Sequence, residues 1–119
     1  MDNILKFLQI NLHKSKTATS ELAKRLDEFQ GNIALLTEPW LDKAGKIRGL
    51  PGCLLFSAPN SVNPRAAICI PLKAKFNCWE VHEFTDRDIS TVCLQHNNTE
   101  LYIASVYIWI SQYQKLMKS

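Results

Sequence analysis

The sequence is expected to hold no segment that carries a protein into or across a membrane. Its longest apolar segment, residues 101–110, is too short to span a bilayer and is interrupted by Ser105. Residues 1–6 contain no basic region followed by an apolar stretch and a small-residue cleavage site, so the sequence shows no secretory signal. We therefore expect no membrane partner and an intracellular, reducing setting for the four cysteines.

The sequence also has no block of like charge, no internal repeat and no low-complexity linker. Its formal net charge is +3 at pH 7, with Lys and Arg spread along the chain, which permits contact with a polyanion without indicating one. An apolar fraction of 46% and a charged fraction of 21% are ordinary for globular proteins. A chain of 119 residues is therefore expected to form one domain at most.

Two apolar runs each stop at a single polar residue. Residues 4–11 end at Asn11, and residues 34–38 end at Glu38. The near-continuous apolar character of the first run predicts a strand buried on both faces. Sites are often built where strands end, although an Asn there is also a common turn former and a Glu before proline is commonly just solvated.

The segment between the two runs predicts an amphipathic helix that serves as scaffold. Ala18, Leu22 and Leu26 fall on one apolar stripe at helical spacing. Thr17 or Thr19 is available to cap the start of this helix. The whole pattern is β-α-β, with a polar residue at the C-terminal end of each strand.

The rest of the chain is predicted to be mostly β. Residues 66–70 read as a buried strand, and residues 76–84 as an extended edge. Residues 89–95 and 101–108 alternate as an antiparallel hairpin, which we expect beside the strand at 66–70. The expected fold class is α+β, with one helix and a mostly antiparallel sheet.

The segments Gln9–Ser15 (QINLHKS) and Leu36–Trp40 (LTEPW), with the helix between them, closely resemble the first two motifs of the endonuclease/exonuclease/phosphatase family. Within that family, the segments look most like the apurinic-type endonuclease domain of non-LTR retrotransposons. The resemblance covers residues 4–108 and implies the N-terminal half of a four-layer αββα sandwich. It also implies that Asn11 and Glu38 help hold a catalytic Mg²⁺, that the partner is DNA and that the protein is nuclear.

Four further residues are candidates on the same resemblance. Tyr107 matches the position of a tyrosine that faces the scissile phosphate, although an aromatic residue is also simply favoured in a strand. His13 and Lys14 lie beside Asn11, and Arg87 lies in a charged turn before a strand, so these three are candidates for contact with the DNA backbone. A solvated polar loop would have the same composition.

The later motifs of the family, an Asp-x-Asn segment and a terminal Ser-Asp-His, do not occur in this sequence, and residues 109–119 form a divergent tail. We therefore expect a metal-dependent phosphodiesterase of DNA endonuclease type by family, truncated and inactive alone, with weak or absent Mg²⁺ binding. The missing half is expected to leave strand residues without cover, which predicts self-association through that sheet face. The residues concerned are Ile68, Ile70, Val106 and Ile108, and the apolar residues of the tail are a candidate substitute cover.

Two other functions remain open. The chain could be a retrotransposon-derived fragment that acts as a nucleic-acid or protein binding module. It could also be a zinc-stabilised binding domain, because Cys78-x3-His82 and Cys93-x2-His96 offer suitable ligand types. Against zinc, the short CxxC spacing is missing and Cys93 alternates within a strand as a small apolar residue.

Overall fold

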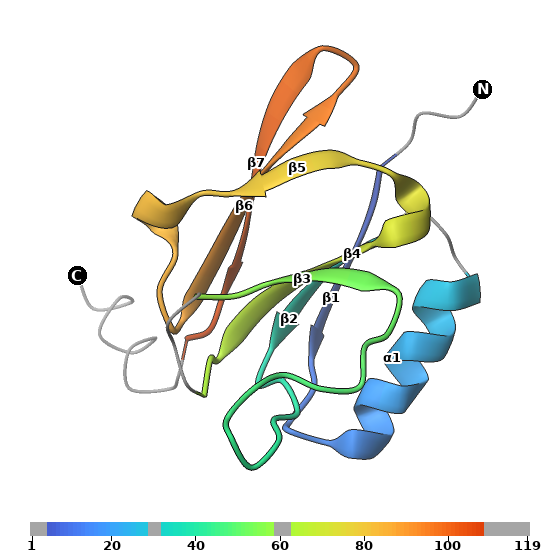
Figure 1. Cartoon of the computed structure of the whole chain (residues 1–119), viewed down its shortest axis with the longest axis vertical. Helices are drawn as coiled ribbons and strands as arrows, with labels where there is room; N and C mark the ends of the chain where they lie inside the picture. The colour runs from blue at the N-terminus through green and yellow to red at the C-terminus, as the bar shows by residue number, and fades with distance from the viewer. Residues whose placement is uncertain (1–4, 29–31, 59–62, 109–119) are drawn as a thin grey trace.

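The computed structural model describes residues 5–28, 32–58 and 63–108, which form one helix and two packed sheets (Figure 1). The first sheet has the strand order β1-β2-β4-β3, and the second has the order β5-β6-β7. The predicted α+β class is confirmed. The elements are β1 (Lys6–Asn11), α1 (Lys16–Glu28), β2 (Asn32–Thr37), β3 (Cys53–Phe56), β4 (Ala66–Pro71), the 3-10 turn η1 (Leu72–Ala74), β5 (Asn77–Glu80), the 3-10 turn η2 (His82–Phe84), β6 (Ile89–His96) and β7 (Thr99–Val106).

The β-α-β unit is present as predicted. Strands β1 and β2 are parallel, and their register pairs Lys6 with Asn32 and Asn11 with Thr37. A parallel pair needs a crossover connection, and α1 supplies it. The C-terminal ends of the two strands therefore lie side by side, which places Asn11 and Glu38 at the same edge of the sheet.

The start of α1 differs from the prediction. Ser15 caps the helix, since its Oγ accepts a hydrogen bond from the backbone N–H of Ala18 at 3.0 Å. Neither Thr17 nor Thr19 serves as the cap, because both already lie inside the helix. Thr19 is buried and donates its hydroxyl to the carbonyl of Ser15 at 2.7 Å.

Among the described residues no helix is long and apolar enough to cross a membrane.

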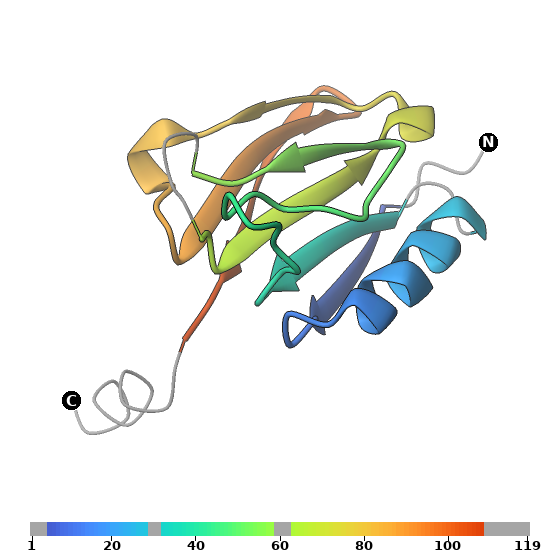
Figure 2. The same cartoon turned by 60° about the horizontal axis from the view of Figure 1, so that its bottom comes forward.

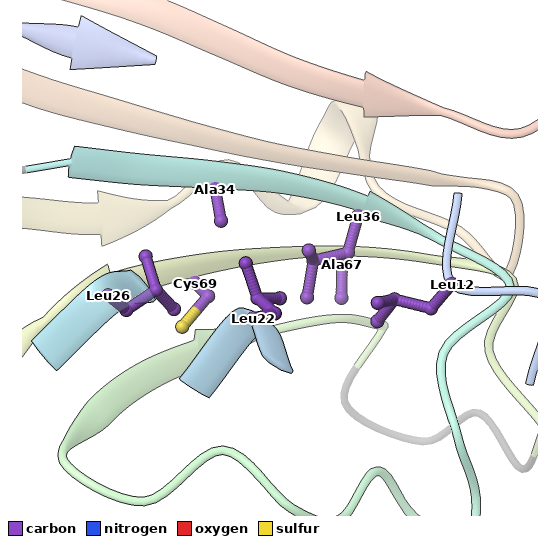
Figure 3. Close-up of a cluster of buried hydrophobic side chains, with 7 residues drawn as sticks. All are labelled: Leu12, Leu22, Leu26, Ala34, Leu36, Ala67 and Cys69. Carbon is purple, nitrogen blue, oxygen red and sulfur yellow. The ribbon is translucent and has the colours of Figure 1, made fainter. Parts of the chain in front are cut away.

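Helix α1 covers the outer face of the first sheet (Figure 2). Leu22 and Leu26 point from the helix onto small and branched side chains of the sheet, as Figure 3 shows. Each fully buried leucine contributes about 1.5 to 3 kcal/mol relative to an exposed one. The buried members of this cluster are Leu12, Leu22, Leu26, Ala34, Leu36, Ala67 and Cys69.

The inner face of the first sheet packs against the second sheet. Ile33 and Ile68 from the first sheet share a buried cluster with Val92, Leu94 and Ile103 from the second. The predicted hairpin is real, but it does not lie beside β4 within one sheet. It belongs to a second sheet that stacks on the first. In the described part of the chain β6 pairs with β5 and β7, and β7 pairs with β6 alone.

This stacking corrects the expected set of uncovered residues. Ile68 and Ile70 have no exposed surface, because strands β6 and β7 cover them. Val106 and Ile108 are indeed about half exposed, at 43% and 46%. The boundary at residue 108 and the proposed cover by residues 109–119 stay predictions, since the tail lies outside the described residues.

The prediction for the first strand was also wrong in one respect. Strand β1 is not buried on both faces but is an edge strand with one covered face. Leu8 and Ile10 pack towards α1, whereas Phe7 is 49% exposed on the other face. An apolar run alone does not distinguish an edge strand from a central one, since the neighbours decide how much of each face is covered.

Candidate active site at the strand ends

Asn11 and Glu38 meet at the C-terminal ends of β1 and β2. The Asn11 side chain donates from Nδ2 to Oε2 of Glu38 at 2.6 Å. The other side of the same amide is also engaged, because Oδ1 of Asn11 accepts the backbone N–H of His13 at 2.8 Å. Two residues 27 positions apart in sequence are thus held in contact by the parallel pairing of their strands.

The backbone around this pair adopts a rare conformation. His13, Lys14 and Glu38 all have positive φ, at 51°, 57° and 49°. Such values cost roughly 1 to 3 kcal/mol for a residue with a side chain. They are enriched at functional sites and also occur in turns, as at Asn97 and Asn98 in the hairpin loop. The surrounding hydrogen bonds hold them in place: Lys14 N–H donates to the Glu38 carbonyl at 2.8 Å, and Glu38 N–H donates to the Arg65 carbonyl at 3.0 Å.

A cavity of about 200 Å³ opens next to Glu38. Three cationic residues, Lys14, Arg65 and Arg87, line it together with that single carboxylate. Trp40 forms part of the wall, and its ring lies 5.5 Å from the Lys16 ammonium. The remaining lining residues are Leu41, Asn63 and Pro64.

Arg65 connects this cavity to the end of β7. Its Nε and a terminal nitrogen donate to the two carboxylate oxygens of Asp88 at 2.5 and 2.7 Å. This fork raises the pKa of Arg65 above its ordinary value, so the guanidinium stays charged. The same guanidinium stacks on the Tyr107 ring at 4.9 Å, and Tyr107 N–H donates to the Asp88 carbonyl at 2.8 Å.

The structure has a clear relative among solved proteins. No family model matches the chain, and no curated protein sequence matches it. The fold is similar to the endonuclease domain of TRAS1, a telomere-specific non-LTR retrotransposon, with a TM-score of 0.73 and 25% sequence identity. The match covers 96% of this chain and 52% of that one, so the chain spans about half the length of its relative. The chain is similar to a retrotransposon endonuclease domain.

This likeness confirms the resemblance drawn from the two motifs and supports a relationship to DNA endonucleases. It also agrees with half of an endonuclease sandwich, since one helix and two sheets occupy three layers of the described chain. A likeness of the whole fold assigns no role to an individual residue. Such roles depend on the geometry of each side chain.

The predicted residues form a first group at the ends of β1 and β2 and a second group that lines the cavity beside it. Asn11, Glu38 and His13 lie together, with His13 Nδ1 3.9 Å from Glu38 Oε2 and its side chain largely exposed. Lys14 and Arg87 line the cavity beside Glu38. The Tyr107 ring contacts the Arg65 guanidinium, which lines the same cavity.

The donor set of the first group suits a hard cation. Glu38 offers a carboxylate and Asn11 an amide oxygen, which are the ligand types that Mg²⁺ takes. In this geometry Nδ2 of Asn11 faces Glu38 and Oδ1 accepts the His13 N–H, so a cation held by both residues would use the second lone pair of Oδ1 together with the Glu38 carboxylate. Two protein ligands leave most of the coordination sphere to water and phosphate, as is usual for Mg²⁺.

The cysteine and histidine pairs do not form a comparable site. Cys78 packs into the cluster between the sheets, whereas Cys93 pairs with Trp79 and Tyr102 on the opposite face. Within the described residues no three His, Cys, Asp or Glu side chains gather as a metal site would require. The zinc hypothesis therefore has no support in the described part of the chain.

Arg65 and Asp88 were missed from the sequence. Asp88 follows Arg87 in the charged turn before β6. Arg65 directly precedes β4, and β4 runs antiparallel to β2, so its N-terminal end had to meet the C-terminal end of β2. That adjacency was the available signal: an arginine just before a buried antiparallel strand lies at the same sheet edge as Glu38.

Proposed function

We propose that the chain carries part of a metal-dependent phosphodiesterase site of the DNA endonuclease type. Asn11 and Glu38 would hold Mg²⁺, and Lys14, His13 and Arg87 would contact the DNA backbone. The hydrogen bond between Asn11 and Glu38 at the strand ends carries this proposal. The likeness to a retrotransposon endonuclease domain supports it, and a nuclear location is proposed on the same ground.

Each residue has a separate part in the proposed site. When bound, Mg²⁺ supplies Lewis-acid polarisation of a phosphate oxygen. Lys14 and Arg87 attract the phosphodiester to the cavity, where their charges outnumber that of Glu38. Tyr107, held under Arg65, is proposed to face the scissile phosphate.

The proposed site lacks a group to activate the attacking water. By the resemblance, that group comes from the Asp-x-Asn and Ser-Asp-His motifs, which this sequence does not contain. A general base typically contributes 10²- to 10⁴-fold in rate. We therefore propose that the chain alone binds Mg²⁺ weakly and hydrolyses DNA poorly or not at all.

Metal binding can be tested without catalysis. Titration of Mg²⁺ into the protein, followed by backbone amide NMR shifts, is expected to move the signals of residues 11–14 and 37–38 first. Glu38→Gln removes the carboxylate charge at constant size and is expected to abolish those shifts. Glu21→Gln, on the exposed face of α1, is the matched control and should leave them unchanged. Shifts that persist in Glu38→Gln would rule out this metal site.

A binding module is the second candidate, and the three cations around one cavity favour it. Oligonucleotide affinity measured over a range of salt, with EDTA present, tests for binding that needs no metal. If Lys14 and Arg87 contact phosphates, Lys14→Gln and Arg87→Gln should each reduce the salt slope of log K by about 1. Plasmid nicking that depends on Mg²⁺ and on Glu38 would instead favour the endonuclease.

A further inference from the structure

Within the described residues, strand β7 has an open edge that is poorly protected against pairing. It lies at the end of the second sheet, and in the described part of the chain only β6 pairs with it. At eight residues it is as long as any strand of the described chain, and it contains one charge, Glu100, with no Lys and no Pro. Proteins usually protect such edges with short strands, lysines, prolines or bulges.

The other sheet shows where an added strand would lie. Phe7 pairs in register with Ile33, whose side chain is fully buried between the two sheets. Phe7 therefore faces the same inter-sheet layer, yet it is 49% exposed. Strand β7 stacks over β2, where Ser105 Oγ donates to the Leu36 carbonyl at 2.7 Å, so the position over β1 is the next one outward from β7.

We propose that the open edge of β7 pairs with β7 of a second copy of this chain. Antiparallel pairing about a two-fold axis at Ala104 places Tyr102 opposite Val106 of the second copy. These side chains are 66% and 43% exposed in the single chain. An aromatic residue opposite a β-branched one is a favourable cross-strand pair.

The same register is compatible with charge and burial. Glu100 lies opposite Ile108 of the second copy, so the two glutamates do not face each other. Ile103 lies opposite Ser105 of the second copy, on the face that turns towards the first sheet. The added strand would cover Phe7 in both chains, since the interface is isologous. The surface thus complements itself without an unpaired charge in its centre.

The experiment is the oligomeric state over a dilution series, measured by light scattering after size exclusion. We expect a concentration-dependent dimer of the native chain. Ala104→Lys puts two like charges opposite each other at the two-fold axis and should shift the protein to monomer. Leu54→Lys, on the exposed edge strand β3, is the matched control and should leave the dimer intact.

Hydrogen exchange of the native chain gives a readout that requires no variant. Amides of residues 99–106 are expected to gain protection as concentration rises, because alternate backbone groups of an antiparallel edge strand lack partners in the single chain. Protection that is independent of concentration would overturn the proposal. So would a monomer at every concentration, or a dimer that Leu54→Lys disrupts and Ala104→Lys does not. If Ala104→Lys loses its cooperative melt, the exchange result on the native chain decides.

Discussion

The ion pair between Arg65 and Asp88 gives the sharpest test of how the candidate site is held together. Both side chains are about one quarter exposed, and two charge-assisted hydrogen bonds join them. Hydrogen bonds to charged groups contribute about 1.5 to 3 kcal/mol when buried, and exposed ion pairs about 0.2 to 1 kcal/mol. We therefore expect Asp88→Asn to reduce the free energy of unfolding by about 2 kcal/mol.

Arg65→Met should cost more than Asp88→Asn. It removes the same ion pair and also the stacking of the guanidinium on Tyr107, which is worth about 0.5 to 1 kcal/mol at a partly exposed site. Arg65 meets the Asn11–Glu38 pair through its backbone, because its carbonyl accepts the Glu38 N–H. Neither substitution changes that backbone group. Mg²⁺-dependent amide shifts are therefore expected to survive in both variants.

The assay is a double-mutant cycle in urea, with the native chain, both single variants and the double variant. The coupling energy isolates the pair from effects on the rest of the protein, and contacting residues typically couple by about 0.5 to 3 kcal/mol. We expect a value of at least 1 kcal/mol. A coupling energy near zero would refute the reasoning. It would mean that the two hydrogen bonds between Arg65 and Asp88 contribute no more to the free energy of unfolding than a solvated ion pair.

Three further outcomes are expected. Ile68→Ala should lower the free energy of unfolding by about 2 to 5 kcal/mol in chemical denaturation, because Ile68 is fully buried between the sheets. Ser105→Ala should cost about 1 kcal/mol in the same assay, since it removes the buried hydrogen bond to Leu36 that joins the sheets. A hydrogen bond from the Lys46 backbone N–H, together with one from the Arg48 side chain, lowers the pKa of Asp42 below its ordinary value. This carboxylate therefore stabilises its loop at neutral pH, and the contribution is lost as pH falls through the lowered pKa. NMR of the Ala44 and Lys46 amides, which both donate to Asp42, would follow that loss, and amide signals that stay unchanged down to pH 2 would contradict it.

The sequence predicted that Asn11 and Glu38 meet at the strand ends because the relevant information is local. An apolar run, an amphipathic segment and a second apolar run specify a parallel β-α-β unit, and a parallel pair places its two C-terminal ends together. Asn11 and Glu38 therefore had to be neighbours once the pattern was recognised. The hairpin of β6 and β7 was likewise predictable, since alternating apolar residues around a short polar loop specify it.

Only the tertiary structure decided which surfaces these elements cover. Whether the hairpin joined the first sheet or stacked on it could not be read from alternation, because the same apolar face satisfies both arrangements. The stacking buries Ile68 between the sheets. The strand orders leave β1 and β7 as edge strands, with Phe7 on β1 exposed. Arg65, Asp88 and Tyr107 come together for the same reason. Their contacts join the starts and ends of three different strands, and such contacts exist only after the two sheets have packed.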